Sequence, residues 1–213
     1  MNPYVLELAA LMAVFSFVIV VPGADLAMVM RQSIVHGRRA AIWTSLGIGV
    51  ALLFHISYTI LGLGLIVSQS VFAFNLVKYA GAAYLFWLGW RSLRDASMPE
   101  MPEPDAVEPA RTMSGAKAFG IGFLTNALNP KPVVFFLSLF SSLVSLSTPA
   151  SVKFGYGLVM ASALILWFVG VSVFFTIPAV RDGFRRAGRW ISRATGLVFI
   201  GLGFKLATEK MHG

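Results

Sequence analysis

The chain has 213 residues, of which 57% are hydrophobic and only 12% are charged, with a formal net charge of +8. Because a soluble domain usually carries about twice that charged fraction, the composition argues against a soluble enzyme, a disordered tail and a secreted disulfide scaffold. The chain contains no cysteine and only three widely spaced histidines, so we expect no thiol catalysis, no disulfide, no metal site and no cofactor.

Apolar windows predict six membrane-spanning segments, which together need about 120 apolar positions at about 20 residues each. The composition supplies that number. In chain order the windows are residues 4–30, 40–67, 71–90, 117–146, 154–180 and about 194–207. The second window has no formal charge and is the clearest, whereas the sixth is short and is bounded by Arg193 and Lys205.

The connection between the third and fourth windows, residues 95–113, differs sharply in composition. It contains four prolines and five acidic residues, which is typical of an extended, solvated linker on the cytoplasmic side. The linker divides the chain into residues 1–94 and residues 114–213, each with three predicted spans. Because three is an odd number, the two halves must insert in opposite orientations.

Two similarities between the halves indicate an internal repeat. The first span of each half carries a proline-containing break, and the third spans share a glycine-aromatic pattern over residues 78–91 and 193–205. Chance similarity of composition is the alternative explanation for the second likeness. Inverted repeats with interrupted helices in matching positions point to a transporter binding site. The sequence therefore predicts an all-α integral membrane protein of six transmembrane helices, arranged as two inverted three-helix repeats with helices one and four broken.

Basic residues predict the orientation of these spans. Twelve Lys and Arg residues lie in the connections after the first, third and fifth spans, and three lie on the opposite side. Since basic connections stay in the cytoplasm, we expect both termini to face the periplasm. Residues 181–193 contain five arginines, which we interpret as an interfacial helix against anionic lipids, with a regulatory partner as the alternative. The positive charge thus marks a membrane face and not a nucleic-acid site.

The break in the first span contains Pro22, Gly23 and Asp25. Pro22 lacks a backbone donor and Gly23 relaxes the helix, so nearby backbone groups must be satisfied by protein, water or ligand. A helix that restarts at about residue 24 would place its partially positive end beside the Asp25 carboxylate. Asp25 can then bind a cation or accept a proton, and a helix cap near the cytoplasmic interface is the structural alternative.

The break in the fourth span contains Asn126, Asn129, Pro130, Lys131 and Pro132. We expect the two prolines to prevent a regular helix, while the two asparagines, three residues apart, can share a face and offer amide donors and acceptors. Lys131 lies near the middle of the span, where a buried ammonium is costly and marks function unless it snorkels to the interface.

Two further titratable residues lie inside predicted spans. Lys78 is near the outer end of the third span, where a functional role and snorkelling remain equal alternatives. His55 stands alone on an apolar helix. Hydrogen-bonded packing is the favoured role for His55, with a proton relay as the alternative.

Several blocks of the sequence together resemble the signatures of a known family. They are Phe15, Pro22-Gly23-Ala24-Asp25, Lys78-Tyr79-Ala80-Gly81-Ala82-Ala83-Tyr84-Leu85 with Leu88-Gly89, residues 119–123, and Asn129-Pro130-Lys131. On these blocks the chain resembles the LysE superfamily, in particular its RhtB branch of homoserine/threonine-type efflux proteins. The resemblance implies a bacterial inner-membrane exporter of amino acids or related metabolites with five or six spans. One departure is Ala24, where the family commonly has a second proline.

Residues and resemblance together lead to one functional hypothesis, a secondary active exporter of a small amino acid or related zwitterion, coupled to protons by antiport. The candidate residues for binding substrate or protons are Pro22, Gly23, Asp25, Lys78, Tyr84, Asn126, Asn129, Pro130, Lys131 and Pro132. Asp25 would receive a proton or the substrate ammonium, and Lys131 would meet the carboxylate. A passive channel and an intramembrane enzyme are the alternatives, and a homo-oligomer is compatible with the glycine-lined helix faces.

Overall fold

The computed structural model describes the chain except for residues 1, 22, 70, 95–112, 175–177 and 209–213. The described part consists of helices joined by short turns, without a strand. The helices are α1 (Pro3–Val20), α2 (Ala24–His36), α3 (Arg38–Gln69), α4 (Val71–Arg94), α5 (Gly115–Ala127), α6 (Pro130–Leu143), α7 (Ala150–Phe174) and α8 (Pro178–Thr208). The all-α prediction is confirmed for this part of the chain, whereas the predicted linker lies almost entirely outside it.

The two breaks divide the first and fourth predicted spans into helix pairs. In the first, α1 ends at Val20 and α2 begins at Ala24. In the fourth, α5 ends at Ala127 and α6 begins at Pro130. The predicted interruption of the fourth span is found at residues 128 and 129, directly before Pro130, and both Pro130 and Pro132 lie in the first turn of α6. A proline in the first turn removes an N–H that would have no intrahelical acceptor, so these prolines begin a helix.

The last two helices differ from their predicted bounds. Helix α7 ends at Phe174, before the predicted end at residue 180, and α8 then runs without interruption from Pro178 to Thr208. The arginine-rich segment is therefore the first half of α8 and continues directly into the last predicted span. After Pro178 no proline follows in this segment, so the backbone hydrogen bonds continue through it despite its charge.

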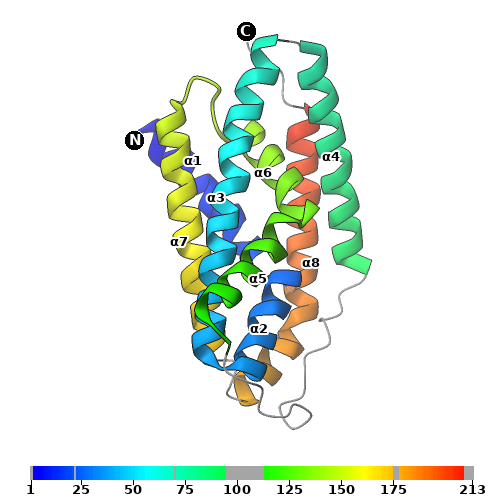
Figure 1. The fold of residues 1–213 in the computed structure, drawn as a ribbon. Helices are drawn as coiled ribbons and strands as arrows, with labels where there is room; N and C mark the ends of the chain where they lie inside the picture. Colours follow the sequence, from blue (N-terminus) through cyan, green and yellow to red (C-terminus); the bar gives the residue numbers. More distant parts are fainter. Residues whose placement is uncertain (1, 22, 70, 95–112, 175–177, 209–213) are drawn as a thin grey trace.

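The helices form an elongated bundle in which α3 packs along α5 and α7, and α4 packs along α8 (Figure 1). Helix α1 begins at the same end of the bundle at which α8 finishes and α6 turns into α7 (Figure 1). We call this the N-terminal end. The turn between α2 and α3 and the start of α5 lie at the opposite end (Figure 1).

Small residues allow the close crossing of α3 and α5. A Cβ atom added to Gly47 would collide with the carbonyl of Phe119, and one added to Gly122 would collide with the carbonyl of Thr44. The Thr44 hydroxyl also donates to the carbonyl of Ala118 at 3.1 Å. The two backbones are thus in direct contact, as is common between membrane helices.

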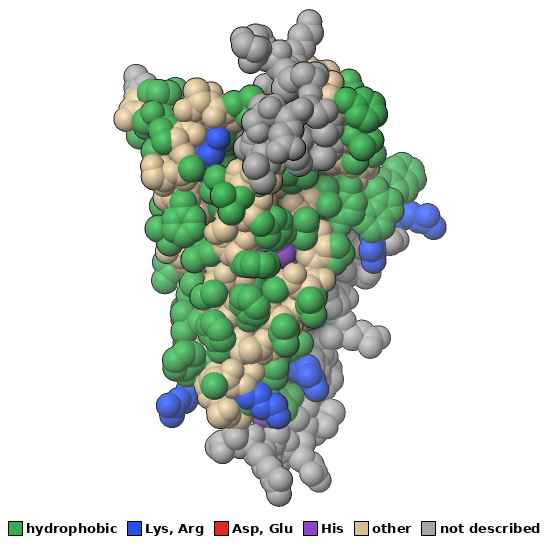
Figure 2. All heavy atoms as spheres, turned by 45° about the horizontal axis from the view of Figure 1, so that its top comes forward, with side chains coloured by type: hydrophobic (Ala, Val, Ile, Leu, Met, Phe, Trp, Pro, Cys, Tyr) green, Lys and Arg blue, Asp and Glu red, His purple; other side chains and the backbone are tan. Residues whose placement is uncertain are grey.

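The outer surface of the bundle is apolar. Large hydrophobic side chains such as Leu61, Leu166 and Leu197 are exposed, and Figure 2 shows hydrophobic side chains over the middle of one face with basic side chains at its lower end. Among the residues that the structure describes, four helical segments are long and apolar enough to cross a membrane: Pro3–Val20, Arg38–Gly62, Ala150–Phe174 and Arg186–Thr208. An exposed apolar surface of this extent is suited to lipid, and the chain is a multi-pass membrane protein.

The crossing of α3 and α5 gives a matched pair of substitutions. Gly122→Ala should lower the free energy of unfolding by about 1–3 kcal/mol, because the methyl group would push the two backbones apart. Gly120→Ala on the same helix has open space and should leave stability unchanged or slightly raised. Thermal unfolding of the purified protein in detergent measures both variants. Equal melting temperatures for the two would contradict the close crossing.

Candidate functional site

A pocket of about 80 Å³ lies where the two helix breaks meet. Its described lining is Phe15, Val18, Ile19, Val21, Gly23, Ala24, Asp25, Leu26, Leu52, Asn126, Asn129, Lys131, Pro132, Phe135, Phe136, Leu164 and Phe168. The pocket therefore draws its polar groups from both breaks and its apolar wall from α1, α3, α6 and α7. That volume is room for several water molecules or part of a small solute.

Asp25 lies in the first turn of α2, at the helix end whose free N–H groups favour a negative charge. The helix cap is Gly23, not Asp25, so the carboxylate is available for other contacts. Its Oδ2 accepts a hydrogen bond from Nδ2 of Asn126 at 2.8 Å, from a residue 101 positions away. Its Oδ1 is buried and has no hydrogen-bond partner among the described residues.

Asn126, in the last turn of α5, is the residue that links the two breaks. Its side-chain amide donates to Asp25, and its backbone carbonyl accepts from the N–H of Asn129 at 3.0 Å and from Nε2 of His55 at 3.0 Å. A carbonyl can only accept, so Nε2 of His55 carries the hydrogen and Nδ1 faces the Tyr58 hydroxyl. His55 of α3 thereby satisfies a carbonyl at the broken end of α5.

Lys131 lies in the first turn of α6 and is partly buried. Its Nζ is 5.7 Å from the centre of the Phe199 ring, and its charge interacts with that of Asp25. The side chain of Asn129 caps α6 by accepting from the N–H of Lys131 at 3.0 Å. Since the beginning of a helix is partially positive, an ammonium there adds to a field that attracts anions.

The remaining predicted site residues have different positions. Pro130 begins α6 but is not among the described lining residues, and Pro22 lies outside the described residues. Lys78 is buried in α4 with its Nζ 4.5 Å from the Tyr79 ring centre. Tyr84, also in α4, is partly buried beside Trp87. Neither Lys78 nor Tyr84 is among the residues that line the pocket.

Sequence reasoning did not predict the apolar wall of the pocket. Phe135 and Phe136 of α6 and Leu164 and Phe168 of α7 all line it. Because the chain is so apolar, its sequence does not distinguish a hydrophobic residue that lines the pocket from the many others in the predicted spans. The signal that was present is spacing, since Leu164 and Phe168 are four residues apart and share one face of α7. The contact between His55 and Asn126, which are 71 residues apart, has no local sequence signal.

A helical membrane protein in which two interrupted helices bring a few polar groups to a largely apolar pocket has the construction of a membrane carrier. The LysE type translocator family matches residues 16–210, and the chain belongs to this family. This confirms the resemblance to the LysE superfamily and its RhtB branch.

Individual relatives agree with this assignment. The chain is 30% identical to the threonine efflux protein of Escherichia coli K12 over 89% of this chain and 91% of the relative. It is 31% identical to the homoserine/homoserine lactone efflux protein of Salmonella typhimurium LT2 over 89% and 90% of the two chains. An uncharacterized membrane protein of Escherichia coli K12, YahN, is 35% identical over 83% of this chain and 78% of the relative. No solved structure matches the chain.

The link between the breaks can be tested by a double-mutant cycle. Asn126→Leu should cost about 2 kcal/mol of stability, because it removes the donor to a buried carboxylate. Asp25→Asn combined with Asn126→Leu should cost less than the sum of the two single changes, because the charge that needed the donor is already gone. Chemical unfolding in detergent measures the four proteins. Strict additivity would mean that this hydrogen bond is absent from the folded protein.

Proposed function

We propose that the protein is a secondary active exporter of a small amino acid or related zwitterion, driven by proton antiport. The observation that carries the proposal is the pocket in which Asp25 and Lys131 provide opposite charges at two helix breaks. A zwitterion carries the complementary pair of charges. The relatives named as threonine and homoserine/homoserine lactone efflux proteins support both the substrate class and the outward direction.

The geometry supports a specific binding arrangement. The buried Oδ1 of Asp25 has an unused acceptor site for the substrate ammonium, while Oδ2 is held by Asn126. The substrate carboxylate would lie against Lys131 and the beginning of α6, which attract an anion for the same reason. The apolar wall that includes Phe168 and Leu52 would contact the substrate side chain.

Proton coupling follows if Asp25 alternates between two occupants. A carboxylate in a membrane pocket binds either a proton or a substrate ammonium, since both compete for the same charge. An exporter would release the zwitterion on one side as Asp25 takes up a proton, and would lose that proton on the other side. This exchange needs no additional charged residue in the pocket.

The order of the helices supports two inverted repeats. In each half a broken pair, α1 with α2 or α5 with α6, precedes two long helices, α3 with α4 or α7 with α8. Such a pattern fits six spans in residues 1–94 and 114–213, joined by the cytoplasmic linker, with the pocket where the repeats meet. We place the protein in the bacterial inner membrane with both termini in the periplasm and the arginine-rich half of α8 near anionic lipids.

Replacing the carboxylate tests the proposed role of Asp25. Asp25→Asn should abolish proton-driven export from loaded proteoliposomes while the protein still inserts, because an amide cannot exchange a proton. Asp182→Asn, at an exposed position on α8 outside the pocket, is the matched control and should export normally. Unchanged export by Asp25→Asn would refute the assignment. Solute flux that never exceeds equilibrium and ignores a protonophore would instead indicate a passive channel.

Replacing the ammonium tests recognition of the carboxylate. Lys131→Met should raise the apparent KM for an exported amino acid by about tenfold or more, equivalent to losing about 1.4 kcal/mol of binding. Inhibition by the corresponding amine, which lacks the carboxylate, should change much less. Competition assays in proteoliposomes measure both values. A proportional loss for the amino acid and the amine would show that Lys131 does not contact the carboxylate.

A further inference from the structure

A polar cluster closes the N-terminal end of the bundle over the helices that line the pocket. The carboxylate of Glu7 on α1 accepts hydrogen bonds from the hydroxyl of Tyr156 on α7, the hydroxyl of Thr148 and the backbone N–H of Ser145, each at 2.9 Å. We call these four residues the Glu7 latch. The latch joins α1 to the turn between α6 and α7 and to α7 itself, across 138 to 149 positions of sequence.

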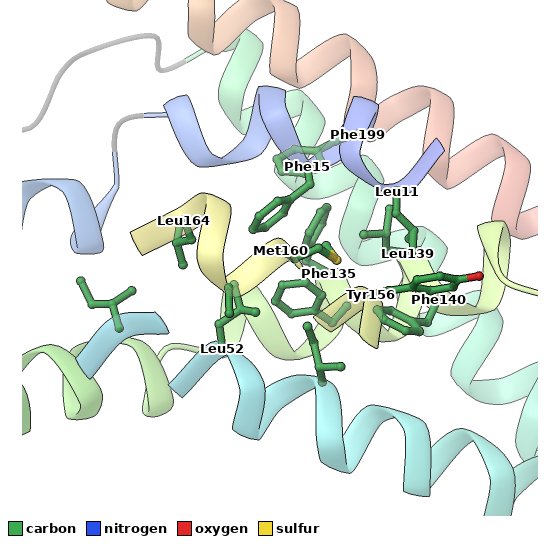
Figure 3. Packing of buried hydrophobic residues seen from close by; sticks show 14 of the residues in the cluster. Leu11, Phe15, Leu52, Phe135, Leu139, Phe140, Tyr156, Met160, Leu164 and Phe199 are labelled. Atoms are coloured by element: carbon green, nitrogen blue, oxygen red, sulfur yellow. The ribbon is translucent and has the colours of Figure 1, made fainter. Parts of the chain in front are cut away.

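Beneath the latch lies a layer of apolar side chains. Leu11, Leu139 and Met160 have no exposed surface, and Phe140 is 2% exposed. Figure 3 shows Leu11, Leu139 and Met160 between Tyr156 on one side and the pocket residues Phe15 and Leu164 on the other, with Phe140 beside Tyr156. We call Leu11, Leu139, Phe140 and Met160 the plug.

On both α1 and α7, a latch residue, a plug residue and a pocket residue follow one another at intervals of about one helical turn. On α1 the sequence of side chains is Glu7, Leu11, Phe15, and on α7 it is Tyr156, Met160, Leu164, each step being four residues. Four residues advance about 6 Å along a helix and return to nearly the same face. The same face of each helix therefore runs from the surface to the binding pocket.

We propose that the Glu7 latch and the plug form the gate through which the solute leaves the pocket toward the N-terminal end. The inference rests on the proposed export function, under which that end faces the periplasm. The gate is closed in this structure. It opens when α1 separates from α6 and α7, which is possible without unfolding α2 because α1 ends as a separate helix at Val20.

The contacts suit a gate that has to open repeatedly. Plug side chains interlock through apolar contacts that have no fixed direction, so they can part and reseal. The Glu7 carboxylate fixes the closed position through charge-assisted hydrogen bonds from one backbone N–H and two side-chain hydroxyls. Alternatively, Glu7 would be a permanent structural link, and that reading predicts that the contact never breaks during transport.

A reversible cross-link tests the gate directly, because the natural chain has no cysteine. In Glu7→Cys/Thr148→Cys, a short bis-methanethiosulfonate reagent should stop export, and a reductant should restore it. The matched control is Phe86→Cys/Phe204→Cys between α4 and α8, whose rings are 4.9 Å apart and outside the gate; cross-linking it should leave export unchanged. Full export by the cross-linked latch variant would overturn the proposal.

A second experiment measures how fast a cysteine in the plug is labelled, so it does not depend on the identity of the solute. Its reference variant retains Glu7. Leu139→Cys in the plug should react slowly with a membrane-impermeant maleimide, and several-fold faster when Glu7→Ala or Tyr156→Phe is added. Ser147→Cys, at an exposed position in the turn, should react at one rate in all backgrounds. Equal rates for Leu139→Cys with and without the latch would overturn the gate. Failure of the wild type to export any amino acid, with latch-dependent labelling intact, would overturn only the proposed function.

Discussion

The hydrogen bond from the Asn126 amide to the Asp25 carboxylate holds the two broken helix pairs together. Each break removes intrahelical hydrogen bonds in a region where lipid offers no replacement, so the protein has to supply partners itself. Asn129 provides one for the beginning of α6, and His55 provides one for the end of α5. Among the buried side-chain atoms of the described residues at the breaks, Oδ1 of Asp25 and Oδ1 of Asn126 have no hydrogen-bond partner, and both residues line the pocket.

The helix ends give the pocket a field before any solute arrives. Both α2 and α6 begin there, so two partially positive ends contribute to one small volume. Asp25 compensates the first, whereas Lys131 increases the second. A lysine is unfavourable at that end of a helix, which makes its position costly without an anion nearby. Under the proposed function, these charges would favour a molecule that carries both charges over one that carries either alone.

Features that act locally along the chain could be predicted from the sequence, and contacts between distant segments could not. The long apolar windows predicted the helices, and proline with glycine marked the breaks. Pro130 and Pro132 follow the second break and begin α6, because a proline that would disrupt a helix interior is well placed in a first turn. Charge indicated an interfacial helix over residues 181–193, and this segment continues into the last span as α8 because helix continuity depends on backbone hydrogen bonds and not on polarity.

The candidate site shows the same division. Asp25, Asn126 and Lys131 stood out because polar side chains are rare in apolar spans, and the structure brings all three to one pocket. Glu7 and His55 were visible in the sequence, but their roles depend on partners 71 to 149 positions away. Lys78 and Tyr84 are also polar side chains within an apolar span, but they are on α4 and do not line the pocket. An unusual residue type marks a candidate, and only the packing of the helices selects among candidates.

The contact between the backbones of α3 and α5 at Gly47 and Gly122 has a consequence for how transport can proceed. No side chain lies between the two helices there that could rotate to let one slide past the other. Asn126, at the end of α5, is therefore held at a constant depth relative to α3. Under the proposed transport function, access would alternate through displacement of the opposite wall, and the fixed and moving parts of the carrier would meet at the Asp25 carboxylate.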